Sequence, residues 1–553
     1  TAALGTCNPL WGQARAAADK IAQKFPIDQD GKMDVRVKAL LEMPTGAASL
    51  IVAAGGGKEK DDVCNALKGM DAKYPFNASA TAEVALPDFA GFFQPGGLFS
   101  KFGKEQVRSG ILSGGVTFEG RGASPAKGSA SRLLLEFGPG NLLTKAQARD
   151  SVQVTQGPAA KSMQLQSDGL DFLIGKGKKL EKAITSGAAR ILVAQGNTKT
   201  VITADQFQGQ FNSRNRPTVM SGSSNVKTVS TTPGKADQIT TSREIVATFN
   251  EQNAIEQIEQ NGDFHYQQDQ QTATADRARY TPADEVINLI GSPRVKDSAS
   301  TLTAESIQLN RKTNVAVAQR DVKVTYTDLK AQSNGGTLGS ADPIHVTGSS
   351  MTASRNTEQA KFTNARLWQS ANIVEAPVIA FDRAHRSLQA QGSAQGRVTA
   401  VYIQQDKSGK SAPVNVTADR LSYVDGERKA VFSGNVVTKA SETRIIADTV
   451  QILLTPRGNQ GSSQLDRIIA QGEIQIEQPN RKATGNQLVY TAADEKLVLT
   501  ASAGKRPTIL DAERGQISGD SLTFYRHDDR VVVDSKEASK TLIQTRIRDA
   551  NRK

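Results

Sequence analysis

The sequence predicts a mainly β protein, an elongated stack of strand-turn-strand repeats behind a small α-rich N-terminal module. Three observations lead to this prediction. A six-residue phrase recurs along the C-terminal part of the chain, and the apolar residues in and after it alternate with a period of two. From residue 107 onward, turn residues interrupt short alternating runs roughly every ten positions, as in all-β proteins. Residues 1–105 differ, because they contain stretches of helical composition.

The phrase consists of a small residue, Asp or Asn, any residue, an apolar residue, any residue and an aromatic residue. Counting on from the aromatic, positions seven and nine are apolar, as in Leu497 and Leu499 after Tyr490. Spacing by two is the period of a strand with one buried face. Polar turn residues lie between the two apolar pairs, so each copy predicts a strand, a turn and a second strand. The four clearest copies are residues 275–280, 418–423, 485–490 and 519–524.

Weaker copies of the phrase at Asp205, Glu305 and Asp448 lack the final aromatic. Asp276 and Glu305 are 29 residues apart, as are Asp419 and Asp448, and a repeat of this length predicts stacked units that bury their apolar faces on one another. The acidic residue recurs at the repeat spacing and is Asn486 in one copy. We therefore expect it to cap a turn rather than to act as a general base. Position eleven is small in every clear copy: Gly291, Gly434, Ala501 and Ser535.

The composition bounds the architecture and the partners. The chain has 553 residues, 38% of them hydrophobic and only 5% aromatic, which suits several sections of extended sheet with a thin interior. The net charge of +12 would attract anions, although a solvated basic surface that maintains solubility explains it equally well. No stretch reaches the roughly 18 apolar residues of a membrane-spanning helix. Cys7 and Cys64 fall in the first 70 residues, where a disulfide between them is one expectation.

Changes in composition divide the chain into four parts. An α-rich module at 1–105 is expected to hold helices over 10–25 and 58–73. Three β sections follow, at 106–235, 236–405 and 406–553, divided at the low-complexity stretches 221–236 and 407–413. A lysine-rich helical interruption is expected over Leu170 to Ile184.

The sequence does not predict catalysis. The four histidines, at positions 265, 345, 385 and 527, lack partners at ligand or triad spacing, and Gly55-Gly56-Gly57-Lys58 does not match the spacing of a phosphate loop. We expect no catalytic residues, no metal and no cofactor, and therefore no enzyme.

The repeated cassettes resemble the OstA-like family of periplasmic lipopolysaccharide-transport proteins, its A and C components above all. The family pattern is a Gly, a short strand, Ala-Asp before an aromatic, and apolar residues leading to another Gly. It matches the stretches 434–448 and 472–490, and the segments 262–291 and up to Ser535 also fit. The resemblance is good from about 250 to 540 and weaker over 107–250. It implies a twisted β-jellyroll with a V-shaped apolar groove that carries acyl chains of lipopolysaccharide from the inner to the outer membrane.

On this basis, the apolar residues of the cassettes are expected to line one strip of the groove. The alternative is that they meet one another in a closed, dry core. Partners would be lipopolysaccharide and other bridge proteins docked edge to edge, with no nucleic acid. Association with the inner membrane would come through partners or through a removed N-terminal anchor. The expected lining residues are Tyr280, Ile287, Leu289, Leu421, Tyr423, Phe432, Leu488, Tyr490, Leu497, Leu499, Leu522, Phe524, Val531 and Val533.

The N-terminal module resembles a different family, the IcmF-related membrane-complex proteins of type VI secretion. The resemblance covers only about 50 residues near the C-terminal part of that family, so no function is carried over. Its matching residues are Cys64, Lys73-Tyr74-Pro75-Phe76, Leu86-Pro87-Asp88-Phe89 and Phe93-Gln94-Pro95-Gly96-Gly97-Leu98.

Three functions remain in competition. The first is a lipid-binding bridge for lipopolysaccharide export, and the second is a structural component of an envelope secretion complex with a closed β core. The third, a basic binder of nucleic acid or polysaccharide, requires solvent-facing aromatics, whereas here the aromatics share the apolar phase of the strands.

Overall fold

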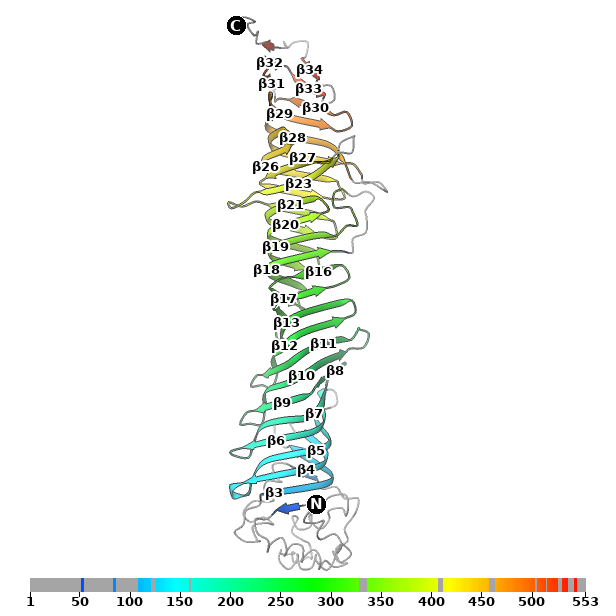
Figure 1. Ribbon diagram of the computed structural model, residues 1–553, viewed down its shortest axis with the longest axis vertical. Coiled ribbons are helices and arrows are strands. Elements are labelled where there is room, and N and C mark those ends of the chain that lie inside the picture. Colours follow the sequence, from blue (N-terminus) through cyan, green and yellow to red (C-terminus); the bar gives the residue numbers. More distant parts are fainter. Residues whose placement is uncertain are drawn as a thin grey trace, which may run out of the picture. The chain divides into compact units, whose positions relative to one another are not determined.

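The structure of the protein is a computed structural model in which almost all described residues are in strands (Figure 1). The helices expected over 10–25 and 58–73, the two cysteines and most of the N-terminal module lie outside the described residues. The described residues are 51–53, 83–85, 108–120, 126–158, 161–327, 336–405, 411–456, 463–502, 505–513, 515–525, 530–535 and 542–544. No helix in this part of the chain is long and apolar enough to span a membrane.

The chain forms two compact units, one of residues 1–269 and 275–283 and the other of residues 270–274 and 284–553. This division differs from the three β sections expected from composition. The stretch 221–231, expected to be part of a linker, is the second half of a long strand, β10.

Among its described residues, unit 1 contains twelve strands and shares a thirteenth with unit 2. A short 3-10 helix, Pro139–Asn141, connects β4 to β5. The strands are β1 Ile51–Ala53, β2 Glu83–Ala85, β3 Ser109–Gly120, β4 Ala126–Gly138, β5 Leu142–Gln156, β6 Met163–Gly175, β7 Lys179–Gln195, β8 Thr198–Ala204, β9 Gln206–Phe211, β10 Pro217–Thr231, β11 Gln238–Phe249, β12 Ile255–Gln268 and the shared β13 Gln271–Thr281.

Unit 2 continues the same pattern of antiparallel strands. They are β14 Val286–Ile290, β15 Arg294–Lys296, β16 Ser300–Thr303, β17 Ser306–Asn310, β18 Val315–Tyr326, β19 Ile344–Ser354, β20 Gln359–Gln369, β21 Asn372–Asp382, β22 Ser387–Gln391, β23 Val398–Gln405, β24 Ser411–Ala418, β25 Arg420–Val424, β26 Lys429–Ala440, β27 Thr443–Leu454, β28 Leu465–Gln478, β29 Arg481–Thr491, β30 Lys496–Thr500, β31 Thr508–Asp511, β32 Gly515–Ser518, β33 Ser521–Tyr525, β34 Arg530–Asp534 and β35 Leu542–Gln544.

Most long strands bend once, and their two halves pair separately with the neighbouring strands. In β18, Val315–Gln319 pairs with Ser350–Ser354 of β19, whereas Val322–Tyr326 pairs with Ile344–Gly348. The register shifts between the two halves, at Arg320 and Asp321, whose positive φ angles of 60° and 46° turn the backbone. Each unit therefore has two walls that meet at a row of corners.

We name the walls from these pairings. In unit 1 the first wall comprises 109–113, 132–138, 142–149, 169–175, 179–186, 206–211, 217–223, 244–249 and 255–261, and the second comprises 116–120, 126–130, 152–156, 163–167, 189–195, 198–204, 226–231, 238–242 and 264–268. In unit 2 the first wall comprises 286–290, 306–310, 315–319, 350–354, 359–363, 378–382, 387–391, 420–424, 429–433, 449–454, 465–471, 487–491, 496–500, 521–525 and 530–534. Its second wall comprises 294–296, 300–303, 322–326, 344–348, 365–369, 372–376, 398–405, 411–418, 436–440, 443–447, 474–478, 481–485, 508–511 and 515–518.

The core lies between the two walls of each unit. In unit 1 the ring of Phe118 on the second wall meets that of Phe172 on the first wall edge to face, with centroids 5.8 Å apart. In unit 2 the side chains of Phe362, Phe381 and Leu367 are fully buried. Alternate residues point into this core, as the period of two predicts.

The helix expected over Leu170 to Ile184 is wrong, because this stretch forms the hairpin of β6 and β7. Alternation brings Leu170 and Phe172 to one face of β6. The backbone then turns at Gly177 and Lys178, whose φ angles are +82° and +61°. A left-handed turn between two alternating runs is hairpin geometry, and cross-strand packing outweighs the helical propensity of the lysines.

The strand-turn-strand cassette is confirmed. Tyr490 of β29 pairs with Leu497 of β30, and Leu488 pairs with Leu499, so the aromatic and position seven lie directly opposite each other.

Candidate functional site

The expected lining residues of unit 2 lie together on the first wall. Their strands pair in an unbroken ladder from β29 to β34: Leu499 lies opposite Leu488 and Leu522, and Val533 lies opposite Leu522. Leu421 and Phe432 are opposite each other in the β25–β26 pair. Directly opposed residues share a face, so these side chains form rows on the inner side of the wall. Tyr280, in β13, is half-buried.

These residues differ in burial according to their depth between the walls. Val533, on β34, is half-buried, but the other residues nearest the corners are 0–1% exposed and form a dry core: Leu289, Leu421, Phe432, Leu488, Leu499 and Leu522. Most of those one step further from the corner are half-buried: Ile287, Tyr490, Leu497, Phe524 and Val531. The inner face is therefore sealed along its deep row and partly accessible along its outer row.

The second wall faces this surface, and sequence reasoning did not identify its residues. Val416, Ile474, Ala483 and Ile509 are all no more than 4% exposed on that wall. The signal was the alternation directly after a corner glycine, as in Gly472-Glu473-Ile474-Gln475-Ile476. This alternation precedes the aromatic phrase, whereas the expected lining residues belong to the phrase and to the stretch after it.

The acidic residue of the phrase holds a corner. The backbone N–H of Asp419 donates to the carbonyls of Ser433 and Gly434, at 3.2 and 3.0 Å. Its carboxylate accepts from Asn435 Nδ2 at 3.0 Å and from Arg397 Nε at 3.2 Å. These are structural bonds within a turn, as expected, and they use the oxygens that a general base would need.

In the weaker copies of the phrase the acidic residue makes the same kind of corner bonds. The backbone N–H of Asp205 donates to the Ser224 carbonyl at 3.0 Å, and its Oδ2 accepts from Asn225 Nδ2 at 2.8 Å. The small residue at position eleven follows from this geometry. Gly434 has a φ of +82°, and a Cβ there would overlap the carboxylate of Asp419.

A segment that we call the strap, residues 336–342, precedes β19 in the chain and bonds to residues at the ends of both walls of unit 2. The N–H of Thr337 donates to the Tyr423 hydroxyl at 2.6 Å, and the N–H of Leu338 donates to Asp425 Oδ1 at 2.9 Å. Arg386 Nη1 donates to the carbonyls of Leu338 and Ser340, at 3.0 and 3.3 Å. Tyr423, Asp425 and Arg386 belong to the first wall or its turns.

The second wall also holds the strap. Gln369 Nε2, at the end of β20, donates to the carbonyls of Ser340 and Asp342 at 3.3 and 2.6 Å. Leu338 is 4% exposed, and Asp425 is fully buried. Burial, followed by the nearby Asp425, raises the pKa of Tyr423, so its hydroxyl stays protonated and donates to that carboxylate. The strap is thus bonded to both walls.

Aromatic contacts close the same stretch. The ring centroid of Tyr326 on the second wall lies 5.4 Å from that of Phe381 on the first wall. The ring centroid of Tyr402, also on the second wall, lies 6.2 Å from that of Phe432 on the first wall. Burial raises the pKa of both tyrosines. Aromatic side chains of the two walls therefore meet at two places between β18 and β26.

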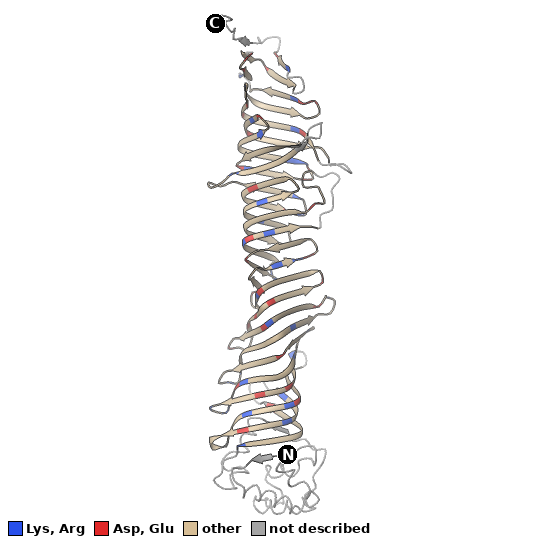
Figure 2. Cartoon of the chain, in the orientation of Figure 1, with Lys and Arg blue, Asp and Glu red and all other residues tan. Residues whose placement is uncertain are grey.

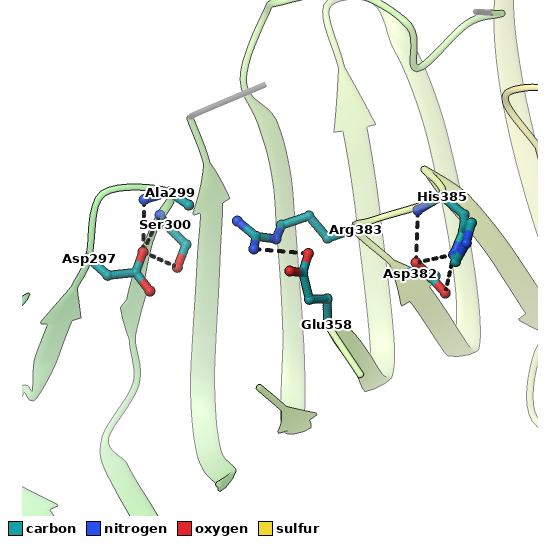
Figure 3. Close-up of polar contacts among 7 residues, drawn as sticks. All are labelled: Asp297, Ala299, Ser300, Glu358, Asp382, Arg383 and His385. Atoms are coloured by element: carbon teal, nitrogen blue, oxygen red, sulfur yellow. Dashed lines mark hydrogen bonds and ion pairs between the residues drawn. The ribbon is translucent and has the colours of Figure 1, made fainter. Parts of the chain in front are cut away.

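Polar residues fix the turns at the rim of this closed stretch (Figure 3). Asp297 Oδ1 accepts from the N–H groups of Ala299 and Ser300, and Arg383 forms a 3.0 Å ion pair with Glu358. Asp382 caps the next turn through the N–H of His385 at 2.9 Å. Burial alone would raise the pKa of Asp382, but the bonds from His385 and Gln359 hold it below its usual value.

Charges of both signs are interspersed along the strands of each unit (Figure 2). Many pair across neighbouring strands, as in Arg149–Asp171 and the 2.8 Å Arg444–Glu477 pair. Among the described residues, no group of three or more His, Cys, Asp or Glu side chains could hold a metal ion. The arrangement offers an apolar interior and a charged exterior.

The fold and this interior define a class of protein, a two-walled β-jellyroll with an apolar inner face. The family model described as LptA/(LptD N-terminal domain) LPS transport protein matches residues 201–315 and 415–530. The resemblance of the cassettes to the OstA-like family of lipopolysaccharide-transport proteins is confirmed over these two segments. The two matched segments contain all four clear copies of the phrase, and residues 1–105 lie outside them.

Individual relatives are distant. The chain is 24% identical over 110 residues to an uncharacterized protein, R00383, of Rhizobium meliloti (strain 1021), an alignment that covers 19% of this chain and 59% of that relative. It also aligns with the crystal structure of LptH from Pseudomonas aeruginosa, described as the LptA homologous periplasmic component of the lipopolysaccharide transport device. That alignment has 20% identity and a TM-score of 0.20, and covers 24% of this chain and 95% of LptH.

Proposed function

We propose that this protein is a non-enzymatic periplasmic bridge component that holds the acyl chains of lipopolysaccharide between its two walls on the way from the inner to the outer membrane. The observation that carries the proposal is the ladder of inner residues from β29 to β34. Its deep row is dry, and its outer row, which includes Leu497 and Phe524, is only half-buried. An acyl chain laid along the outer row would complete the burial of these side chains.

The energy of such binding is sufficient. Removing about a dozen methylenes from water contributes roughly 10 kcal/mol at about 0.8 kcal/mol for each, before the cost of ordering the chain and the protein. The charged outer face keeps the sugar portion of the lipid in water. Transfer without chemical change requires no catalytic group, in keeping with the structural role of the phrase carboxylates.

The direct test is native mass spectrometry of the protein extracted from its envelope, with lipopolysaccharide as the expected bound mass. Leu499→Asp or Leu522→Arg places a charge in the fully buried row and should abolish the bound lipid while leaving most of the β-structure intact. Val532→Asp is the matched control, because Val532 is 40% exposed on the opposite face of β34. Equal lipid occupancy in Leu499→Asp and Val532→Asp would contradict the proposal.

A second candidate is a structural spacer in an envelope complex. The observation that favours it is the stretch between β18 and β26, where the strap and two aromatic contacts connect the walls. A protein that is a spacer along its whole length would be extracted without lipid, and the charged substitutions would affect only its stability.

Partners of the same architecture would dock on a free strand edge. Among the described residues, β34 pairs only with β33, which leaves its other edge available to a strand of a further bridge protein. A proline at Val532 or Asp534, whichever N–H points to that edge, should prevent such pairing without reaching the interior.

A further inference from the structure

The inner face of the second wall in unit 1 changes from apolar to polar over β8, β10, β11 and β12. Ile191 and Ile202 lie opposite each other in the β7–β8 pair, and Thr228 lies opposite Ile202 in the β8–β10 pair. Opposed residues share a face, so the polar residues continue the row that the isoleucines begin. We call them the polar panel: Thr198, Thr200, Thr228, Ser230, Gln238, Thr240 and Gln268.

The panel belongs to the interior and not to the outer surface. Thr228 lies opposite Thr240, and Ser230 lies opposite both Thr200 and Gln238. The same row in β7 and β8 reaches the core cluster of Ala189, Ile191, Ala204, Phe207 and Val226. All members of the panel are half-buried.

The facing wall is mainly apolar, with Gln260, which lies opposite Ile245 and donates to Ser242 Oγ at 3.3 Å, as its buried polar residue. Met220 and Ile245, on the first wall, pack against that same core cluster. In unit 2 the second wall instead carries Val324, Val346 and Leu367 at buried inner positions. A continuous row of polar residues therefore marks this part of unit 1, whereas the inner Thr438 of unit 2 lies singly between Val416 and Ile445.

The side chains in the outer part of the polar panel form hydrogen bonds with one another. The hydroxyls of Thr200 and Ser230 are 2.8 Å apart, and Gln268 Oε1 accepts from Gln238 Nε2 at 3.3 Å and from the Tyr266 hydroxyl at 2.7 Å. These bonds hold the side chains in place. They also leave lone pairs and protons on the hydroxyls and amides for a further partner.

The hydroxyls in the deeper part of the polar panel do not bond to one another. Thr228 Oγ1 and Thr240 Oγ1 are buried and have no hydrogen-bond partner within the described residues. A buried hydroxyl without a partner costs about 1–3 kcal/mol. Valine would fill the same space and favour the strand at no such cost, so packing alone gives no reason for two adjacent threonines.

We propose that the polar panel is a binding site for the hydroxyl and amide groups that lie next to the acyl chains of an acylated sugar lipid. The acyl chains contact Met220 and Ile245, and the hydroxyl and amide groups bond to Thr228 and Thr240. This inference rests on the proposed function and adds that lipids with such groups bind here more tightly than lipids with plain acyl chains.

The test compares two ligands on the full chain. Affinities for lipopolysaccharide and for palmitate are measured with wild type, with the double variant Thr228→Val/Thr240→Val, and with Thr203→Val/Thr241→Val. The last is a matched control, because Thr203 and Thr241 alternate with the panel on the same strands and point to the opposite face.

We expect the panel variant to lose lipopolysaccharide affinity by roughly 5- to 100-fold, the equivalent of two ordinary hydrogen bonds, and to keep its palmitate affinity. Thr228→Ser/Thr240→Ser, which retains both hydroxyls, should bind lipopolysaccharide as wild type does. Unchanged lipopolysaccharide affinity in the valine variant would overturn the panel site alone, while the proposed function would stand. A wild-type protein that binds neither ligand would overturn both.

Discussion

The strap provides a quantitative test of how firmly the middle of unit 2 is closed. Arg386 is 4% exposed, and its Nη1 holds the carbonyls of Leu338 and Ser340. Arg386→Met keeps much of the aliphatic volume and removes both donors. Gln369 Nε2 still donates to the Ser340 carbonyl, so only the Leu338 carbonyl is left unpaired, and the docked strap should lose roughly 1–3 kcal/mol relative to its undocked state.

Hydrogen exchange at the strap amides measures this loss. The N–H groups of Thr337 and Leu338 donate to Tyr423 and Asp425, and they exchange only when the strap leaves the walls. A loss of 1–3 kcal/mol corresponds to exchange that is faster by roughly 5- to 150-fold. Amides in the paired strands of β29 and β30 should exchange as in wild type.

The matched control is Arg383→Met, three residues earlier. Arg383 forms an ion pair with the half-exposed Glu358 at the rim (Figure 3), and within the described part of the chain its side chain is not among the strap's hydrogen-bond partners. Its loss should leave the strap amides protected, because exposed ion pairs contribute little. Strap exchange that is unchanged in Arg386→Met, or equally accelerated in Arg383→Met, would refute the assignment of Arg386 as the anchor.

Two further predictions concern the corners and the ion pairs. Gly434→Ala should lower the melting temperature, because it forces a left-handed alanine against the Asp419 carboxylate at a cost of about 1–2 kcal/mol or more. Gly426→Ala is the control and should not lower it, because a Cβ at Gly426 meets open space. Equal melting temperatures of the two variants would contradict the corner geometry. Burial alone would raise the pKa of Asp171, but the bonds from Arg149, Gln147 and Lys145 outweigh burial and hold this pKa below its usual value. Its stabilisation is therefore complete above the unfolded pKa and is lost as pH falls through the folded pKa. Acid unfolding followed by circular dichroism should show this loss of stability in wild type and a smaller loss in Asp171→Asn. Identical acid sensitivity of the two proteins would argue against the Arg149–Asp171 pair.

The β architecture followed from the sequence because the alternation is local. The pairing of Tyr490 with Leu497 is set by a short turn and a period of two, which one stretch of chain displays in full. The role of Asp419 as a corner residue was also accessible, since Asn486 replaces it in one repeat. These features depend on neighbours within one repeat.

The rest depended on contacts between distant residues. The strap's partners Asp425 and Arg386 lie far along the chain from Leu338, and no local pattern marks a segment that bonds to both walls. The second wall was missed because its residues, such as Ile474, precede the phrase that drew attention to the first. The hairpin at Gly177 was mistaken for a helix because lysines favour helices, whereas the left-handed turn that decides the matter is a property of the backbone.

The central claim is that the space between the walls holds acyl chains, and two adjacent valines test it most directly. A photo-crosslinking residue at position 531 would replace a half-buried side chain opposite Phe524 on the inner face, and the same residue at position 532 would replace a side chain that is 40% exposed on the outer face. The account predicts a lipopolysaccharide adduct from the Val531 position and none from the Val532 position. Adducts of equal yield from both, or from neither in cells that export lipopolysaccharide normally, would contradict it.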